Sequence, residues 1–273
     1  MRKRLTQVFP FLLPIRKKQK LFCFYTKMSL DSNTYVKEVM KTTLPFVQCE
    51  TISQLINKNT GFDIKYQENK VFNLILAIEP IDGIMIKPTE TFSLWRLIRY
   101  ADKVTQYKEG LTVVNGETIA SVGGGLCQLS NLLFDLFLHS PLTIIERHGH
   151  RMKEFPELSN HIVKGIDATI AEGWLDLKVV NETNRTYQVK LNIQNNEITA
   201  TLYCDKEPEY DYEIINDHLH YFYKDKQCIE EVDVIKVIKS RTNNESVRIE
   251  KCYTNRCIIA YELPSEIKVE GEK

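Results

Sequence analysis

The stretch Ser121-Val-Gly-Gly-Gly-Leu-Cys-Gln-Leu-Ser-Asn131 joins three glycines to a cysteine at the point where a helical pattern begins. A helix from Leu126 to Leu138 would place Cys127 opposite an apolar face made of Leu129, Leu132, Leu133, Leu136 and Phe137. Glycines permit positive φ angles and close backbone approach, and a helix N-terminus carries unpaired N–H groups with a partial positive charge. The sequence therefore predicts a buried helix with the Cys127 thiol at its first turn.

This position suits a reactive thiol, because a positive helix end stabilises a thiolate and a lowered pKa makes cysteine a usable nucleophile. Gly123, Gly124, Gly125 and Gln128 are the accompanying candidates for binding a ligand or an oxyanion. The same pattern also fits a plain glycine turn followed by a half-buried cysteine. Both interpretations stay open at the level of the sequence.

Composition indicates a globular chain of one or two domains, with 273 residues of which 43% are hydrophobic and 26% charged. The 36 basic and 36 acidic residues cancel, so bulk charge gives no argument for nucleic acid, and we expect no nucleic-acid partner. The longest apolar run is far below the roughly 18 residues that a membrane span needs. We therefore expect no transmembrane span.

Cysteine usage favours reduced thiols, because seven is an odd number and a chain of this size does not need disulfides to fold. Cys252 and Cys257 are separated by four residues and could join Cys204 or Cys228 around zinc, but the chain contains no Cys-x-x-Cys pair. We expect no metal and no cofactor. A cytoplasmic location follows from the reduced thiols.

The N-terminus is basic around a short apolar segment, Val8 to Ile15. It resembles a signal peptide only superficially, because the apolar segment is about eight residues long, contains two prolines and lacks a small-residue cleavage site. We expect this arm to dock on the body of the protein. Peripheral contact with an anionic membrane surface, and hence membrane association, is the alternative.

Periodicity predicts an α+β fold, an antiparallel sheet with a central helix after the Gly-Gly-Gly-x-Cys loop. Short helices are expected within 33–44 and 52–57, a central strand at 71–78, a short strand at 84–87 and a helix at 94–98 capped by Ser93. A hairpin should turn at Asn115-Gly116. Strands follow at 142–147, 175–179, 187–193, 198–202, 232–238, 247–252 and 257–263, while 210–226 shows no clear period.

Most of the sheet should come from residues 70–203. The chain would then divide into a basic arm with a helical N-terminal segment (1–65), a core domain (66–205) and a β-rich C-terminal extension (206–273).

A Cys-His-Asp centre needs a thiol, an imidazole and a carboxylate that orients the imidazole. Cys127 precedes His148 and His150 at the end of a predicted strand, and Asp167 lies in Gly165-Ile-Asp-Ala-Thr169. Residues i and i+2 of a strand point the same way, so either histidine is a candidate base, and the pair could equally flank a metal or pack without function. Asp-Ala-Thr also reads as a turn or capping signal.

Several separated motifs resemble those of the VanW family. They are Phe92-Ser-Leu-Trp95, Tyr107-Lys-Glu-Gly-Leu111, Gly123-Gly-Gly-Leu-Cys-Gln-Leu-Ser130, Pro141 to Arg147, His150, Asp167-Ala-Thr169 and Asp176-Leu-Lys178. The resemblance covers roughly residues 1–200 and implies an accessory protein of vancomycin-resistance gene clusters, linked to the cell wall. In relatives the histidine segment often reads His-x-His-Ser, whereas Arg151 follows His150 here.

Three functions are compatible with these residues. The first is a cysteine-dependent acyl transferase or hydrolase acting on peptides of peptidoglycan or its precursors. In it Cys127 would be the nucleophile, His148 or His150 the base and later the acid, Asp167 the orienting group, and Gln128 or backbone N–H groups of 124–126 the oxyanion site. The second is a protein that binds a phosphate or muropeptide group without turnover. The third is an interaction protein whose glycine loop is structural.

Overall fold

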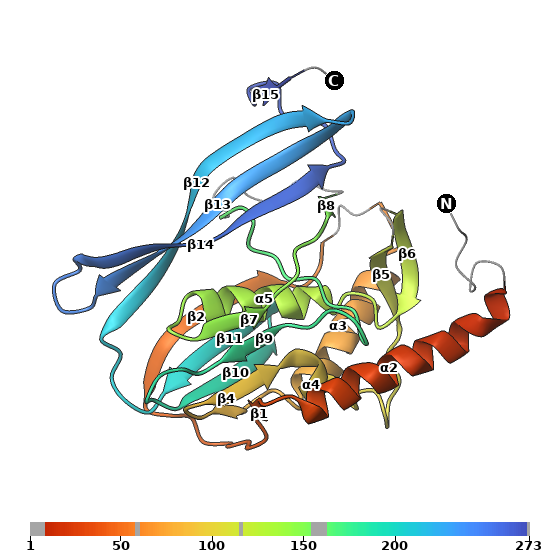
Figure 1. The fold of residues 1–273 in the computed structure, drawn as a ribbon. Coiled ribbons are helices and arrows are strands. Elements are labelled where there is room, and N and C mark those ends of the chain that lie inside the picture. Colours follow the sequence, from red (N-terminus) through yellow and green to blue (C-terminus); the bar gives the residue numbers. More distant parts are fainter. Residues whose placement is uncertain (1–8, 58–60, 115–116, 154–162, 272–273) are drawn as a thin grey trace.

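The computed structural model describes residues 9–57, 61–114, 117–153 and 163–271 and has the predicted α+β architecture (Figure 1). Its helical elements are η1 (Pro10–Leu12), α2 (Leu13–Leu30), α3 (Lys65–Ile78), α4 (Leu94–Ile98) and α5 (Cys127–Leu138). The strands of the first half are β1 (Thr34–Tyr35), β2 (Phe46–Gln54), β3 (Met85–Ile86), β4 (Glu90–Ser93), β5 (Glu109–Val114) and β6 (Glu117–Val122). Those of the second half are β7 (Thr143–Glu146), β8 (Met152–Lys153), β9 (Lys178–Val180), β10 (Tyr187–Gln194), β11 (Glu197–Cys204), β12 (Tyr210–Lys224), β13 (Gln227–Ser240), β14 (Ser246–Ile259) and β15 (Val269–Glu270).

Two small sheets build the core, in the orders β1-β4-β9-β7 and β2-β11-β10-β3. The β10–β11 hairpin turns through Asn195 and Asn196, both with positive φ, as its two-residue loop requires. The predicted β5–β6 hairpin forms with Val114 opposite Glu117. The tip expected at Asn115-Gly116 lies outside the described residues. Pairing between strands is antiparallel apart from three short parallel contacts, β1 with β4, β12 with β15 and β14 with β8.

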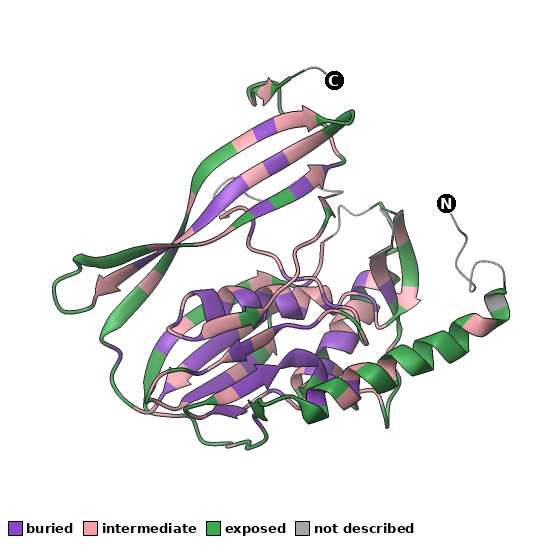
Figure 2. Ribbon diagram, viewed as in Figure 1, coloured by how far each residue is buried: buried purple, intermediate pink, exposed green. Residues whose placement is uncertain are grey.

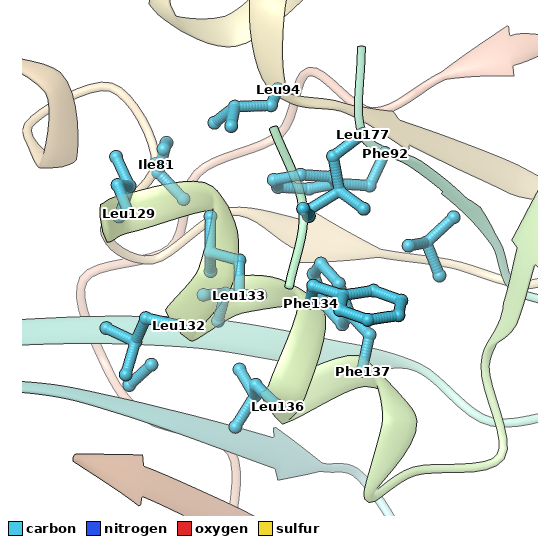
Figure 3. Close-up of a cluster of buried hydrophobic side chains, with 14 of the residues drawn as sticks. Ile81, Phe92, Leu94, Leu129, Leu132, Leu133, Phe134, Leu136, Phe137 and Leu177 are labelled. Atoms are coloured by element: carbon cyan, nitrogen blue, oxygen red, sulfur yellow. The ribbon is translucent and has the colours of Figure 1, made fainter. Parts of the chain in front are cut away.

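The α5 helix lies at the centre of the core (Figures 1 and 3). Its predicted apolar face is buried, and the burial extends further round the helix to Ser130, Phe134 and Leu138. Phe137 packs edge-on against Phe92 of β4 at 5.1 Å between ring centroids, and Phe134 faces Tyr253 of β14. Because other elements cover it on several sides, α5 is fixed in place, and so is the cysteine at its first residue (Figure 2).

The predicted strand at 71–78 is wrong, because these residues form most of α3. Asn73, Leu74 and Ala77 are buried at helical spacing, so the helix turns one face inward. A short apolar run does not by itself distinguish a buried strand from a buried helix.

The two predicted N-terminal helices are also wrong. The segment 33–44 is extended, with β1 beside β4 and Val39 bridged to Ile84. Residues 52–54 belong to β2, which pairs with β11 along its whole length, and the helix of this region is α2 instead. The sheets therefore draw strands from outside 70–203, and the N-terminal segment shares a sheet with the core. The division at residues 65 and 205 stays a prediction.

The C-terminal part is a long curved sheet of β12, β13 and β14, seen above the core in Figure 1. The two strands predicted at 247–252 and 257–263 are one continuous strand, β14, and residues 210–224 form β12 without a clear hydrophobic period. A register shift between Val234 and Ile235 accompanies the bend of this sheet. At its far end β14 pairs with β8, which follows the histidine segment directly.

Candidate functional site

The glycine run is a tight turn that starts α5. Gly123 and Gly125 have φ angles of 78° and 93°, and a side chain on Gly124 would collide with the backbone of Gly110 in β5. Buried Asn73 of α3 clamps this contact, because its Nδ2 donates to Gly124 O at 3.0 Å and its Oδ1 accepts from Lys108 N at 2.8 Å. Gly123 to Gly125, predicted as ligand-binding residues, thus build the turn and pack against β5.

Cys127 is the first residue of α5, as predicted. Within the described chain, no hydrogen bond uses the backbone N–H groups of Leu126 and Cys127. They are the candidate oxyanion donors, together with the positive end of the helix. Gln128 is turned the other way, because its Nε2 donates to Ser53 Oγ at 2.8 Å and to Gln54 O at 2.6 Å on β2.

The first turns of α5 also position the irregular segment that carries Asp167. Ser130 Oγ donates to Ala168 O at 2.5 Å, and Asn131 Oδ1 accepts from Ala168 N at 2.7 Å. These two bonds bring the residues on either side of Ala168 to the thiol. Cys127 Sγ lies 3.8 Å from Thr169 Oγ1 and 4.0 Å from Ile170 O.

His150 stands between the thiol and the carboxylate. Its Nδ1 is 2.7 Å from Asp167 Oδ2, and its backbone N–H donates to the same oxygen at 2.5 Å. The His150 imidazole lies near enough to the Cys127 thiol for each group to shift the pKa of the other towards its charged form. The structure therefore brings Cys127, His150 and Asp167 together in the order that a Cys-His-Asp centre requires.

The electrostatics of this group favour a thiolate and an imidazolium. Burial opposes ionisation of Cys127, but the neighbouring His150 imidazole, the backbone of Ile170 and the Thr169 hydroxyl lower the pKa of the thiol below its ordinary value. Burial likewise disfavours the charged imidazole, yet the hydrogen bonds with Asp167 and Cys127 raise the pKa of His150 to about 9. The two charges stabilise each other.

His148 is not in this group. Its Nε2 is 3.2 Å from Glu146 Oε1, and Glu146 also binds Lys178 at 2.9 Å. The argument that both histidines point the same way assumed a strand, but β7 ends at Glu146 and the chain from 147 to 150 is irregular. Of the two histidines, His150 is the one whose ring contacts the Asp167 carboxylate and lowers the pKa of the thiol.

Arg147 is the main residue that sequence reasoning missed. Its Nη2 donates to Asp167 Oδ1 at 2.6 Å and to Gly165 O at 3.0 Å, and its Nε donates to Asp167 O at 2.6 Å. Asn255 Oδ1 of β14 accepts from Arg147 Nη2 at 3.1 Å. The only signal in the sequence was its place beside Glu146 in a family motif.

Other family motifs meet in a second buried cluster. Asp176 accepts from Ser93 Oγ at 2.6 Å and from Trp95 N at 3.0 Å, which ties the Phe92–Trp95 motif to the Asp176–Lys178 motif. The predicted Ser93 cap is confirmed, because its Oγ accepts from Arg96 N. Lys178 then bridges this cluster to Glu146. These motifs are explained by folding contacts.

No cluster of three or more histidine, cysteine, aspartate or glutamate side chains suited to a metal occurs in the described part of the chain. All seven cysteines are unpaired. Among the helices that the structure describes, none is long and apolar enough to cross a membrane.

Comparison with known proteins identifies relatives along the whole chain. The family model described as "VanW like protein" matches residues 69–203. The "Vancomycin B-type resistance protein VanW" of Enterococcus faecalis is 48% identical over 269 residues, which is 98% of each chain. An "Uncharacterized protein YoaR" of Bacillus subtilis is 27% identical over 163 residues, 58% of this chain and 52% of that protein. No solved structure shows significant similarity.

Proposed function

Because the chain belongs to the VanW family, we propose that it is an accessory protein of glycopeptide resistance with cysteine-dependent acyl-transfer or hydrolase activity on peptidoglycan peptides or their precursors. The observation that carries this proposal is the Cys127–His150–Asp167 arrangement at the start of α5. Cys127 is the nucleophile, His150 the proton carrier and Asp167 the group that orients it. The link to vancomycin rests on the name of the Enterococcus relative.

In the proposed mechanism the reaction starts from the Cys127 thiolate and the His150 imidazolium. The Cys127 thiolate attacks the carbonyl carbon of a peptide bond, and backbone N–H groups at the start of α5 stabilise the oxyanion. The C–N bond then breaks as the His150 imidazolium gives its proton to the leaving amine, which leaves a thioester. Water or an acceptor amine attacks the thioester, His150 takes the proton of that nucleophile, and the thiolate leaves.

The covalent intermediate gives the decisive test. The full chain is incubated with isolated muropeptides, quenched in acid and analysed by intact-protein mass spectrometry with peptide mapping. We expect an acyl adduct on Cys127 in the wild type and none in Cys127→Ala or His150→Ala. If muropeptides bind saturably but no adduct forms under any quench time, the chain is a binding protein for wall precursors and the enzyme proposal fails.

Resistance itself is tested in a cell. A glycopeptide-resistant host that carries this chain in place of its own VanW is compared with one that carries Cys127→Ala at equal protein level. We expect a lower inhibitory concentration of vancomycin for the variant. Equal resistance of the two strains would remove the thiol from the proposed function.

We propose that this activity takes place on the cytoplasmic side of the membrane and that the N-terminal part of the chain contacts the membrane surface. Helix α2 buries Tyr25 and Met28 near its end, whereas Ile15 and Phe22, seven residues apart on one face, are 63% and 72% exposed. The exposed cations Arg16, Lys17, Lys18 and Lys20 flank them. Apolar side chains among cations suit an anionic lipid surface.

Vesicle sedimentation tests this contact. We expect binding to phosphatidylglycerol-rich vesicles that weakens with salt and is absent for phosphatidylcholine alone. The double change Ile15→Glu and Phe22→Glu should abolish it, while Val104→Glu, a matched change at a 96% exposed site elsewhere, should not. Equal sedimentation of all three proteins would exclude α2 as the contact.

A further inference from the structure

A cavity of about 540 Å³ lies between the core and the C-terminal sheet, and Cys127 does not line it. One wall is the continuous segment 141–147, which includes β7, and the facing wall comes from Lys236 of β13 and from residues of β14. Arg147 lines the cavity while its guanidinium holds Asp167. The cavity is therefore separate from the thiol, but Arg147 belongs both to the cavity wall and to the residues that position Asp167.

Two strand edges border this cavity. Among the described residues, β7 is the last strand of its sheet and pairs only with β9. β14 pairs with β13, and β8 covers its other edge at Ile258 and Ile259; no other described strand pairs with that edge, which includes the part from Arg248 to Tyr253. Every residue of 141–147 lines the cavity, not every second one, which means that the backbone edge itself faces the space. Open edges present backbone groups that can pair with an added strand.

Lys236 brings a buried charge to the same cavity. Lys236 is only 7% exposed. Its Nζ donates to Ser140 O at 3.0 Å and lies 5.5 Å from the centre of the Tyr212 ring. An ammonium group has three donors, so this single carbonyl does not satisfy it. Burial lowers the pKa of Lys236.

No carboxylate oxygen lies within ion-pair distance of Lys236 Nζ in the residues that the structure describes. Glu250 stands opposite it in the β13–β14 ladder but pairs with Arg248 at 2.8 Å. Glu146, also in the wall, pairs with Lys178 and His148. Burial lowers the pKa of Lys236 overall and outweighs the charge of Glu250, which raises it, so an incoming anion stabilises the buried ammonium further.

We propose that this groove binds an extended peptide that adds as a strand to the edge of β7 and places its free C-terminal carboxylate on Lys236. The open backbone edge favours a peptide over an inorganic anion. A phosphate site would need several free donors, but Arg147 is engaged by Asp167 and Arg248 by Glu250. Aromatic walls from Phe134, Tyr212 and Tyr253 supply apolar contact. The inference goes beyond the proposed function, because it holds whether or not Cys127 reacts.

Titration calorimetry on the full chain tests the carboxylate. The probes are N-acetyl-trialanine with a free carboxylate, the same peptide as its C-terminal amide, and inorganic phosphate. We expect the acid to bind at least tenfold more tightly than the amide, and phosphate not to compete. Lys236→Met should abolish the preference for the acid, Lys236→Arg should keep it, and Arg248→Met, a matched change at an exposed cation of the rim, should leave it unchanged.

Two further measurements keep this test independent of folding defects and of the thiol. In the wild type, hydrogen exchange of the β7 amides should slow when the acid peptide binds, and Cys127→Ala should bind it as the wild type does. Equal affinity for acid and amide, no binding of either, strong competition by phosphate, or unprotected β7 amides would each overturn the proposal. Loss of binding in Cys127→Ala would also overturn the proposal, because it would show that the peptide binds at the thiol site and not in a separate groove.

Discussion

Arg147 and Asp167 form a largely buried ion pair in which the guanidinium holds both the carboxylate and the main-chain carbonyl of the same residue. Arg147 occupies Oδ1 and so leaves Oδ2 to His150. Burial raises the pKa of Asp167, but its bond to His150 and the charge of Arg147 outweigh that effect and lower it. Asp167 is thereby kept charged and correctly turned for the imidazole.

Replacing Arg147 should disturb the site without touching the thiol. Arg147→Met leaves the Asp167 carboxylate without its buried partner, so we expect a loss of about 3–5 kcal/mol in unfolding free energy. The pH profile of Cys127 alkylation should also move to higher pH, because His150 loses its orientation. Arg256→Met, at a 69% exposed arginine paired with Glu231, should change stability by only about 1 kcal/mol or less. An unmoved pH profile in folded Arg147→Met would show that Arg147 does not position the pair.

Cys127 should be the fastest-reacting thiol at neutral pH. Its lowered pKa raises the thiolate fraction about tenfold for each pKa unit, whereas burial raises the pKa of Cys204 and Cys228. Alkylation by iodoacetamide, resolved by peptide mass spectrometry, measures all seven rates in one sample. Exposed Cys23 on α2 serves as the accessible reference.

Replacing each of the two histidines in turn gives a variant and its matched control for the alkylation experiment. His150→Ala should slow alkylation of Cys127 alone, while His148→Ala, which loses only its contact with Glu146, should not. Equal effects of the two changes would contradict the assignment of His150. The Cys127→Ser protein should stay folded, because the residue is only half-buried at the end of the helix.

The charge state of His150 follows from its partners. A raised histidine pKa means stability that is fully present below the unfolded value of about 6.5 and lost as the pH rises through about 9. A lowered thiol pKa acts oppositely, giving stability above the unfolded value that is lost as the pH falls through the folded value. NMR titration of His150 should show a midpoint near 9 in the wild type and a lower one in Asp167→Asn and in Cys127→Ser. Unchanged midpoints would rule out the coupled pair.

Local signals predicted the parts of the site that depend on local geometry. The glycine turn, α5 and the Ser93 cap each depend on residues that are close in sequence, so hydrophobic periodicity and capping preferences were enough to predict them. Long-range partners decide the rest. Asp167 reaches His150 through bonds of Ala168 to α5, and Arg147 reaches Asp167 from the far side. An apolar stretch such as α3 becomes a helix because its neighbours in space bury one face, which the sequence alone does not state.

Replacing Gly124, which contacts Gly110 closely, should lower the unfolding free energy more than replacing Gly123, whose positive φ is the main obstacle to a side chain. Gly124→Ala forces the β5 backbone away from the turn, so we expect a loss of about 3 kcal/mol or more, in the range of overpacking. Gly123→Ala has space for the new methyl and meets only its positive φ, which is unfavourable by about 1 kcal/mol. Chemical unfolding measures both changes. Similar losses would mean that the Gly110 contact relaxes freely.

Asp176 should make the stability of the chain depend on pH in the acid range. Burial, supported by the charge of Glu146, raises its pKa to about 6, against the hydrogen bonds of Ser93 and Trp95 that lower it. A raised aspartate pKa means that its contribution is fully present below the unfolded value of about 3.9 and is lost as the pH rises through about 6. Asp176→Asn, which stays neutral, should therefore gain up to about 3 kcal/mol relative to the wild type between pH 4 and pH 7. Asp211→Asn, at an exposed aspartate paired with Arg241, is the matched control for removing a carboxylate charge. A constant difference between wild type and Asp176→Asn across this range would mean that Asp176 is ionised in the folded protein throughout, held by Ser93, Trp95 and Lys178.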